Sequence, residues 1–209
     1  MPSPFRGWAF FFGVFRETMP SSIVLWSVAA ILLFWGVGAY NRLMRLRAEA
    51  NTAFAALEGE LSKQVALVHE CLPLPDATQP ASLGGDPGFW SGLHGAAAQF
   101  AASLAVARPR PLEPQGIAAL SAAQDVLAMA WERAERDDAH DLAGPRLPET
   151  LTARRAQIVM QTHTAIEHFD RAVARYNNGI SQFPAVLVAW LFGFKPGRRM
   201  RTSANDAVA

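Results

Sequence analysis

The chain has 209 residues, of which 51% are hydrophobic and 18% are charged, and its formal net charge is +1. This length allows one membrane helix and one folded domain with its own core, but no second domain. A charge this close to zero, without a long basic run, argues against a nucleic-acid-binding protein. The single cysteine, Cys71, excludes an internal disulfide framework and any cysteine-rich zinc or iron–sulfur site.

Residues 1–20 carry an aromatic patch flanked by Arg6 and Arg16. The patch consists of Trp8, Phe10, Phe11, Phe12 and Phe15. Aromatic rings beside arginines favour the headgroup layer of a membrane. We therefore expect residues 1–20 to form an interfacial segment that lies on the bilayer rather than crossing it.

Residues 21–40 are predicted to form one transmembrane helix. No residue in 23–39 is charged, and 20 residues at about 1.5 Å each span roughly 30 Å, the thickness of the hydrocarbon layer. Pro20 provides a helix start, and an aromatic and basic belt follows the apolar run, as expected at a membrane surface. The belt consists of Trp35, Tyr40, Arg42, Arg45 and Arg47.

Two properties of this anchor stay open. The tripeptide Val37-Gly38-Ala39 resembles the cleavage site of a removable signal peptide, although the segment ahead of the apolar run is long for such a peptide. Basic residues flank the anchor on both sides, and the small excess behind it favours a domain on the cytoplasmic side only slightly.

Four apolar stripes with a spacing of three and four residues follow the anchor within residues 41–183. The first continues directly from the anchor, and proline- and glycine-rich stretches separate the others. The stripes cover residues 43–72, 90–107, 117–134 and 158–183. Strand-like alternation is absent from the sequence. The pattern predicts an all-α fold in which a single transmembrane helix continues into an antiparallel four-helix up-and-down bundle.

Residues 184–209 form a tail that is first apolar and then basic. Residues 183–194 are apolar on every side but too short to cross a bilayer, so something must cover them. The cover is either the bundle's own end, or the headgroup layer or a partner protein, since four antiparallel helices return the chain to the membrane side. The candidate surface consists of Phe183, Pro184, Leu187, Trp190, Leu191, Phe192, Phe194, Lys195, Arg198 and Arg199.

Two stretches of the chain resemble the LemA family of bacterial membrane-anchored helical proteins. The first, Tyr40-Asn41-Arg42-Leu43, follows the anchor, and the second combines Tyr176-Asn177, Phe183-Pro184 and Leu191-Phe192-Gly193-Phe194-Lys195-Pro196. The segment after Lys63 departs from the family pattern, so the chain resembles a divergent member. The resemblance implies a single-pass protein of the bacterial inner membrane with a helical bundle, and it implies no particular reaction.

No residue pattern in the sequence predicts catalysis, a cofactor or a metal site. The two Glu-x-x-His motifs of a carboxylate di-iron site are absent, as are a phosphate-binding glycine loop and a nucleophile elbow. His163 and Glu167 are four residues apart on one predicted helix, where we expect an ordinary neighbour contact. We therefore expect that the protein is not an enzyme.

These features favour a membrane-tethered scaffold or protein-interaction module of the bacterial envelope. Its expected partners are membrane lipid and other membrane or envelope proteins, with self-association as a further option. One alternative is a ligand-binding or enzymatic bundle with a membrane-proximal pocket near Tyr176 and Trp190. Another is a regulator of a neighbouring membrane protease or transporter.

Overall fold

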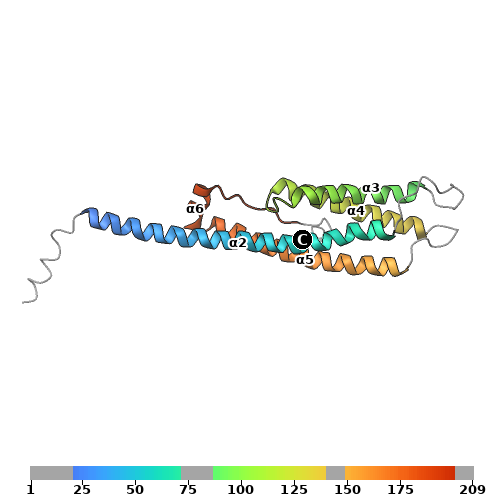
Figure 1. The fold of residues 1–209 in the computed structure, drawn as a ribbon, viewed down its shortest axis with the longest axis horizontal. Helices are drawn as coiled ribbons and strands as arrows, with labels where there is room; N and C mark the ends of the chain where they lie inside the picture. The colour runs from blue at the N-terminus through green and yellow to red at the C-terminus, as the bar shows by residue number, and fades with distance from the viewer. Residues whose placement is uncertain (1–20, 72–86, 140–148, 201–209) are drawn as a thin grey trace, which may run out of the picture.

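The computed structural model describes residues 21–71, 87–139 and 149–200, and its regular secondary structure there is entirely helical (Figure 1). The helices are α2 (Ser21–Cys71), α3 (Pro87–Ala107), α4 (Pro114–Ala139), α5 (Glu149–Ser181) and α6 (Ala185–Phe192). The prediction of an all-α chain is confirmed for this part of the sequence. The predicted interfacial segment 1–20, the predicted loop 73–85 and the last residues of the tail, 201–209, lie outside it.

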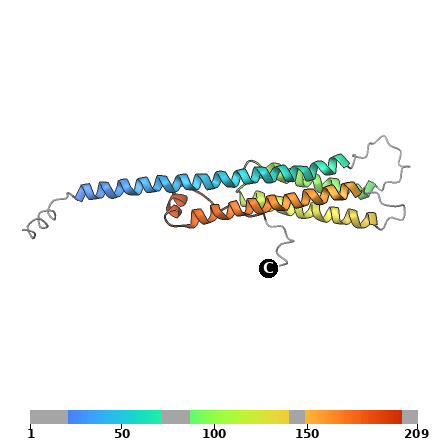
Figure 2. The ribbon, with the colours of Figure 1, turned by 90° about the horizontal axis from the view of Figure 1, so that it is seen from below.

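Helix α2 is continuous over 51 residues, which corresponds to roughly 75 Å at about 1.5 Å per residue. The predicted anchor and the first stripe are therefore one helix, as expected. The large apolar side chains of residues 23–35 are exposed, whereas Leu43, Ala50, Phe54 and Leu57 are buried. Figure 2 shows that the first part of α2 extends well beyond the other helices. A single helix thus has one fully exposed apolar part and one part that packs into a core.

Helices α2 and α5 form an antiparallel pair. Glu49 pairs with Arg175, near the end of α5, and Glu70 at the end of α2 pairs with Arg154, near the start of α5. Between them, Gln64 Nε2 donates to Thr162 Oγ1 at 2.9 Å. The hydrogen bond and charge of the Arg154 guanidinium lower the pKa of the exposed Glu70 carboxyl. The partners' numbers rise along α2 as they fall along α5, which fixes the direction of the pair.

Helices α3 and α4 form a hairpin that packs against α2, and the four long helices lie side by side around one apolar core (Figures 1 and 2). Pro114 occupies the first turn of α4, where its missing N–H costs nothing. In this core the Phe54 and Phe169 rings meet edge to face, with centroids 5.5 Å apart. Burying one such aromatic side chain stabilises the fold by about 1.5–3 kcal/mol.

The hairpin ends before the α2–α5 pair does. Arg108, directly after α3, pairs with Glu58, so the hairpin turn lies about 18 residues beyond Tyr40 along α2, or roughly 27 Å. Beyond this turn, the described neighbours of α2 and α5 are each other, α6, Phe194 and Leu112 of the turn itself. Figure 1 shows α6 and the segment after it running along this part of the pair.

Candidate functional site

Helix α6 lies where the exposed apolar part of α2 meets the part that packs into the core. The turn before it closes with Val186 N–H donating to Gln182 O at 2.9 Å and Leu187 N–H donating to Pro184 O at 3.0 Å. Gly193 ends the helix with φ 69°, and Phe194 N–H donates to Ala189 O at 2.9 Å. This left-handed cap favours glycine, which explains Gly193 between two aromatic residues. The predicted tail thus contains a helix, which the sequence analysis did not assign.

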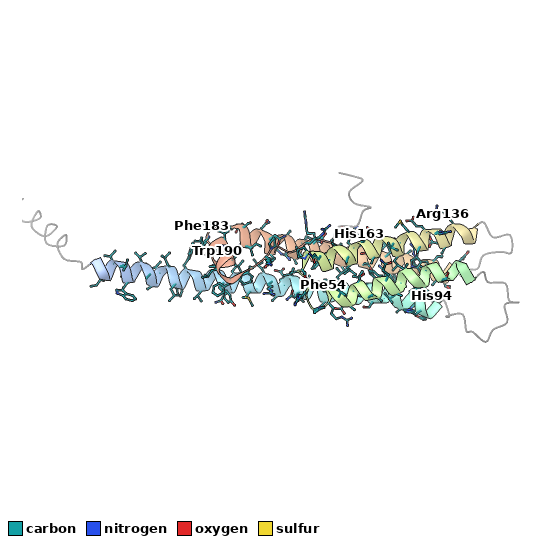
Figure 3. All side chains as sticks on the ribbon, turned by 90° about the horizontal axis from the view of Figure 1, so that it is seen from above. Phe54, His94, Arg136, His163, Phe183 and Trp190 are labelled. Atoms are coloured by element: carbon teal, nitrogen blue, oxygen red, sulfur yellow. The ribbon has the colours of Figure 1, made fainter. Side chains whose placement is uncertain are left out.

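The two faces of α6 have different surroundings. Ala185 and Ala189 are buried in a small cluster with Leu43, Tyr176 and Ile180. Val188 is half-buried against this cluster, whereas the large side chains of the other face point outward, with Phe183 76% and Trp190 82% exposed, at the end of α5 in Figure 3. The exposed apolar residues are Phe183, Val186, Leu187, Trp190, Leu191 and Phe192. The bundle's own end therefore covers two alanines that were not part of the predicted surface. Of the predicted apolar residues, Pro184 and Phe194 are half-buried, and the others are exposed.

Aromatic contacts place α6 beside the last turns of the predicted anchor. The Trp35 and Phe183 ring centroids are 5.7 Å apart. Tyr40 contacts Phe192 at 5.0 Å and Phe194 at 6.1 Å, again between ring centroids. The exposed surface of α6 is therefore continuous with the exposed apolar surface of α2.

Residues 194–200, here called the C-terminal strap, run back along α5 and are attached to it by the predicted motif Tyr176-Asn177. Tyr176 Oη donates to Lys195 O at 3.0 Å. Asn177 Nδ2 donates to Gly197 O at 2.8 Å, and Gly197 N–H donates to Asn177 Oδ1 at 2.9 Å. Burial raises the pKa of the Tyr176 phenol, a shift that the Arg47 charge partly offsets. The Tyr-Asn dipeptide thus recognises the strap backbone through three hydrogen bonds.

Two further residues fix the strap, and the sequence analysis missed both. A Cβ on Gly197 would lie 3.0 Å from Leu112 Cδ2 and 3.3 Å from Val173 Cγ1, so a larger residue does not fit without movement. Met200 is fully buried in the main core, and its N–H donates to Asp170 Oδ1 at 2.6 Å. The available signal was a single large apolar residue directly after Arg198 and Arg199.

Residues 21–48 and 171–200, which form this end of the molecule, contain eight of the 19 basic residues and none of the 18 acidic ones. Two of the eight have acidic neighbours on adjoining segments, since Arg171 pairs with Glu167 and Arg175 with Glu49. The other six are exposed and have no ion pair within the described residues. They are Arg42, Arg45, Arg47, Lys195, Arg198 and Arg199. The basic residues that are scattered in the sequence therefore gather at one end of the fold.

The structure brings most of the predicted motif residues together. Leu43 is fully buried under α6, and the Tyr40 ring contacts Phe192 in a tilted and Phe194 in an edge-on arrangement. Asn41 and Pro196 are exposed. Tyr176 is 2% exposed beneath the strap, whereas Trp190 faces outward. The geometry therefore does not favour a pocket lined by Tyr176 and Trp190 together.

The described residues contain no cluster of three or more histidine, cysteine or carboxylate side chains that could hold a metal ion. His163 Nδ1 and Glu167 Oε1 are 3.5 Å apart with both side chains largely exposed, so the expected neighbour contact is confirmed. Of the described helices, α2 is the one long and apolar enough to cross a membrane. No protein family, curated protein or solved structure matched this chain.

Proposed function

We propose that this chain is a single-pass, membrane-tethered scaffold or interaction module of the bacterial envelope, a divergent relative of the LemA family with no reaction of its own. In this proposal residues 21–40 cross the inner membrane. The remaining long helices form an antiparallel four-helix bundle that projects from it.

The observation that carries the proposal is the two-part surface of α2. None of the most apolar 18-residue stretch of this helix is buried inside the protein. Soluble proteins rarely expose a contiguous apolar patch of this kind, because the exposure opposes folding and promotes aggregation. Lipid removes this cost, because its apolar chains replace water around the apolar side chains. The backbone is also satisfied there, since a helix makes its own hydrogen bonds in a bilayer.

The bundle supports a role in interaction at a distance from the membrane. From Tyr40 to Cys71, α2 continues for 31 residues, or roughly 47 Å. A rigid bundle of this length holds its far end well beyond the headgroups. The resemblance to the LemA family supports the same proposal. Its motif residues Tyr176 and Asn177 have a structural role, since their hydrogen bonds attach the closing segment of the chain to α5.

Alkaline carbonate extraction of membranes that contain the full chain tests the anchor. We expect the chain to remain in the membrane pellet. Ile31→Arg combined with Leu32→Arg should release it, because each arginine at the bilayer centre costs about 2.5–3.5 kcal/mol. Val106→Arg is the matched control, since Val106 is also exposed and apolar but lies on the bundle. Release of the unmodified chain by carbonate would contradict the proposal.

The interaction role needs a second measurement on the same material. The full chain, purified from detergent-solubilised membranes, should return a reproducible partner or self-associate. The absence of both would count against a scaffold while leaving the membrane anchor in place.

A further inference from the structure

We propose that α6 is a second membrane contact, which lies in the headgroup layer beside the anchor and favours anionic lipid. This inference rests on the proposed function, because it requires residues 21–40 to be in the bilayer. It assigns an occupant to the uncovered face of α6, which carries Phe183, Val186, Leu187, Trp190, Leu191 and Phe192.

The level of α6 along the anchor is the first argument. Its flanking and terminal aromatic residues contact Trp35 and Tyr40, the last residues of the predicted span. A span that starts near residue 21 places Tyr40 about 30 Å away, at the boundary of the hydrocarbon layer. Tryptophan and other aromatic side chains favour this boundary, so Trp190 lies where the bilayer stabilises it.

Continuity of the surface is the second argument, and it favours lipid over a protein occupant. The outward side chains of α6 adjoin the exposed apolar residues of α2 through the Trp35–Phe183 contact. Lipid that surrounds the anchor therefore reaches α6 without a gap. A second copy or another protein would have to displace this lipid. At eight residues, α6 is far too short to cross the bilayer, so it can only lie in the interface.

Charge supplies the preference for anionic lipid. Arg42, Arg45 and Arg47 are exposed and lie two to seven residues beyond Tyr40, or about 3–11 Å along α2. This is within about one Debye length of the headgroups, where each basic residue contributes about 1 kcal/mol. Arg198 and Arg199 are held farther along the bundle, because the neighbouring Met200 is fixed at Asp170. The arginines of α2 should therefore dominate the effect.

The attachment of the strap explains how so short a helix keeps its position. Gly193 closes α6, and the Tyr176-Asn177 hydrogen bonds fix the chain two to four residues later. Ala185 and Ala189 hold the opposite face against Leu43. The large apolar side chains are thus presented before lipid arrives, and the ordering cost of binding is small.

The test uses spin labels on the full chain in lipid vesicles, in a Cys71→Ser background. A label at Leu187→Cys reports on α6. Leu32→Cys is the matched site on the anchor, since Leu187 is 59% and Leu32 58% exposed, and Val106→Cys is the water-facing site on the bundle. The measurement is the ratio of collision rates with oxygen, which enters lipid, and with a water-soluble nickel chelate.

We expect the label at residue 187 to give a ratio above that at residue 106 and below that at residue 32, because the headgroup layer lies between water and the bilayer centre. A ratio at 187 equal to that at 106, with a lipid-like ratio at 32, would overturn the inference and leave the proposed function intact. Water-like ratios at both 187 and 32 would overturn both. Strong spin–spin broadening at 187 would identify a second copy as the occupant and also overturn the inference.

Lipid composition tests the charge preference. Vesicles that contain phosphatidylglycerol should raise the ratio at residue 187 above its value in phosphatidylcholine alone. Replacing Arg42, Arg45 and Arg47 with glutamine should remove this difference, whereas Arg133→Gln and Arg136→Gln, on the bundle, should preserve it. Equal ratios in the two lipids for the unmodified chain would overturn the preference for anionic lipid.

Discussion

The two ends of this molecule use the same kinds of side chain in opposite ways. In the distal part, where all four long helices run together, large apolar side chains such as Phe54 and Phe169 face one another. Charges of both signs pair there across the surface, as in Arg108–Glu58 and Arg154–Glu70. At the end that carries α6, the largest apolar side chains face outward, and six exposed charges have a single sign.

This difference supports the proposal that one end faces water and the other a membrane. A closed apolar core is what a domain in water requires, because apolar burial supplies most of its stability. The exposed ion pairs on its surface add little to that stability. Outward aromatic residues with unpaired cations are stable beside a bilayer with anionic headgroups. Substitutions that act differently at the two ends can therefore break or sharpen the comparison.

The largest expected effect on stability is at the distal core. Phe169→Ala should lower the free energy of unfolding by about 3–5 kcal/mol, because it leaves a cavity against Phe54 where the fold cannot collapse fully. Trp190→Ala, at the other end, should change it by less than about 0.5 kcal/mol, since this side chain is largely exposed. Chemical denaturation of the detergent-solubilised chain, followed by circular dichroism, measures both.

A large loss of stability from Trp190→Ala in detergent would break the comparison. It would mean that the outward face of α6 packs against protein, and the two ends would then be stabilised in the same way.

A smaller effect is expected where Gly179 of α5 faces Leu43 and Leu46 of α2. A Cβ on Gly179 would lie 2.6 Å from Leu46 Cδ1 and 3.5 Å from Leu43 Cδ2. Gly179→Val should therefore push α2 and α5 apart under α6 and cost about 1–3 kcal/mol. Gly59→Ala is the control, since a Cβ there meets nothing within 4 Å and alanine should stabilise the helix by about 1 kcal/mol. Equal effects of the two changes on the unfolding midpoint would contradict the close approach.

Much of the helical layout could be predicted from the sequence, because it depends on local patterns. The spacing of apolar residues from Leu43 onward predicted the continuation of the anchor into a core helix, and α2 is continuous there. The apolar stripes predicted at residues 90–107 and 117–134 lie within α3 and α4. These signals act within one or two turns of a helix, so periodicity reveals them.

The candidate site depends on contacts between residues far apart in the sequence, and periodicity does not report them. The sequence predicted that the apolar tail forms a surface. It did not predict which face is buried, because that depends on where Leu43, more than 140 residues earlier, packs against Ala185 and Ala189. Asn177 was identified by resemblance, and its partner Gly197 was not identified at all. The gathering of Arg42, Arg45 and Arg47 with Lys195 likewise follows from the return of the chain along α5.

The last expected effect is a local one, at the attachment of the strap to α5. Asn177→Ala removes both side-chain hydrogen bonds to Gly197, each of which contributes about 0.5–1.5 kcal/mol net. Asn178→Ala is a matched control, because the Asn178 side chain is exposed and makes no such hydrogen bond within the described residues.

Hydrogen exchange measures the difference directly, since the Gly197 N–H donates to Asn177 Oδ1. We expect roughly tenfold faster exchange at Gly197 in Asn177→Ala, because a tenfold change corresponds to about 1.4 kcal/mol. Unchanged exchange would mean that Met200 alone holds the strap, and the position of α6 would then not depend on the Tyr-Asn pair.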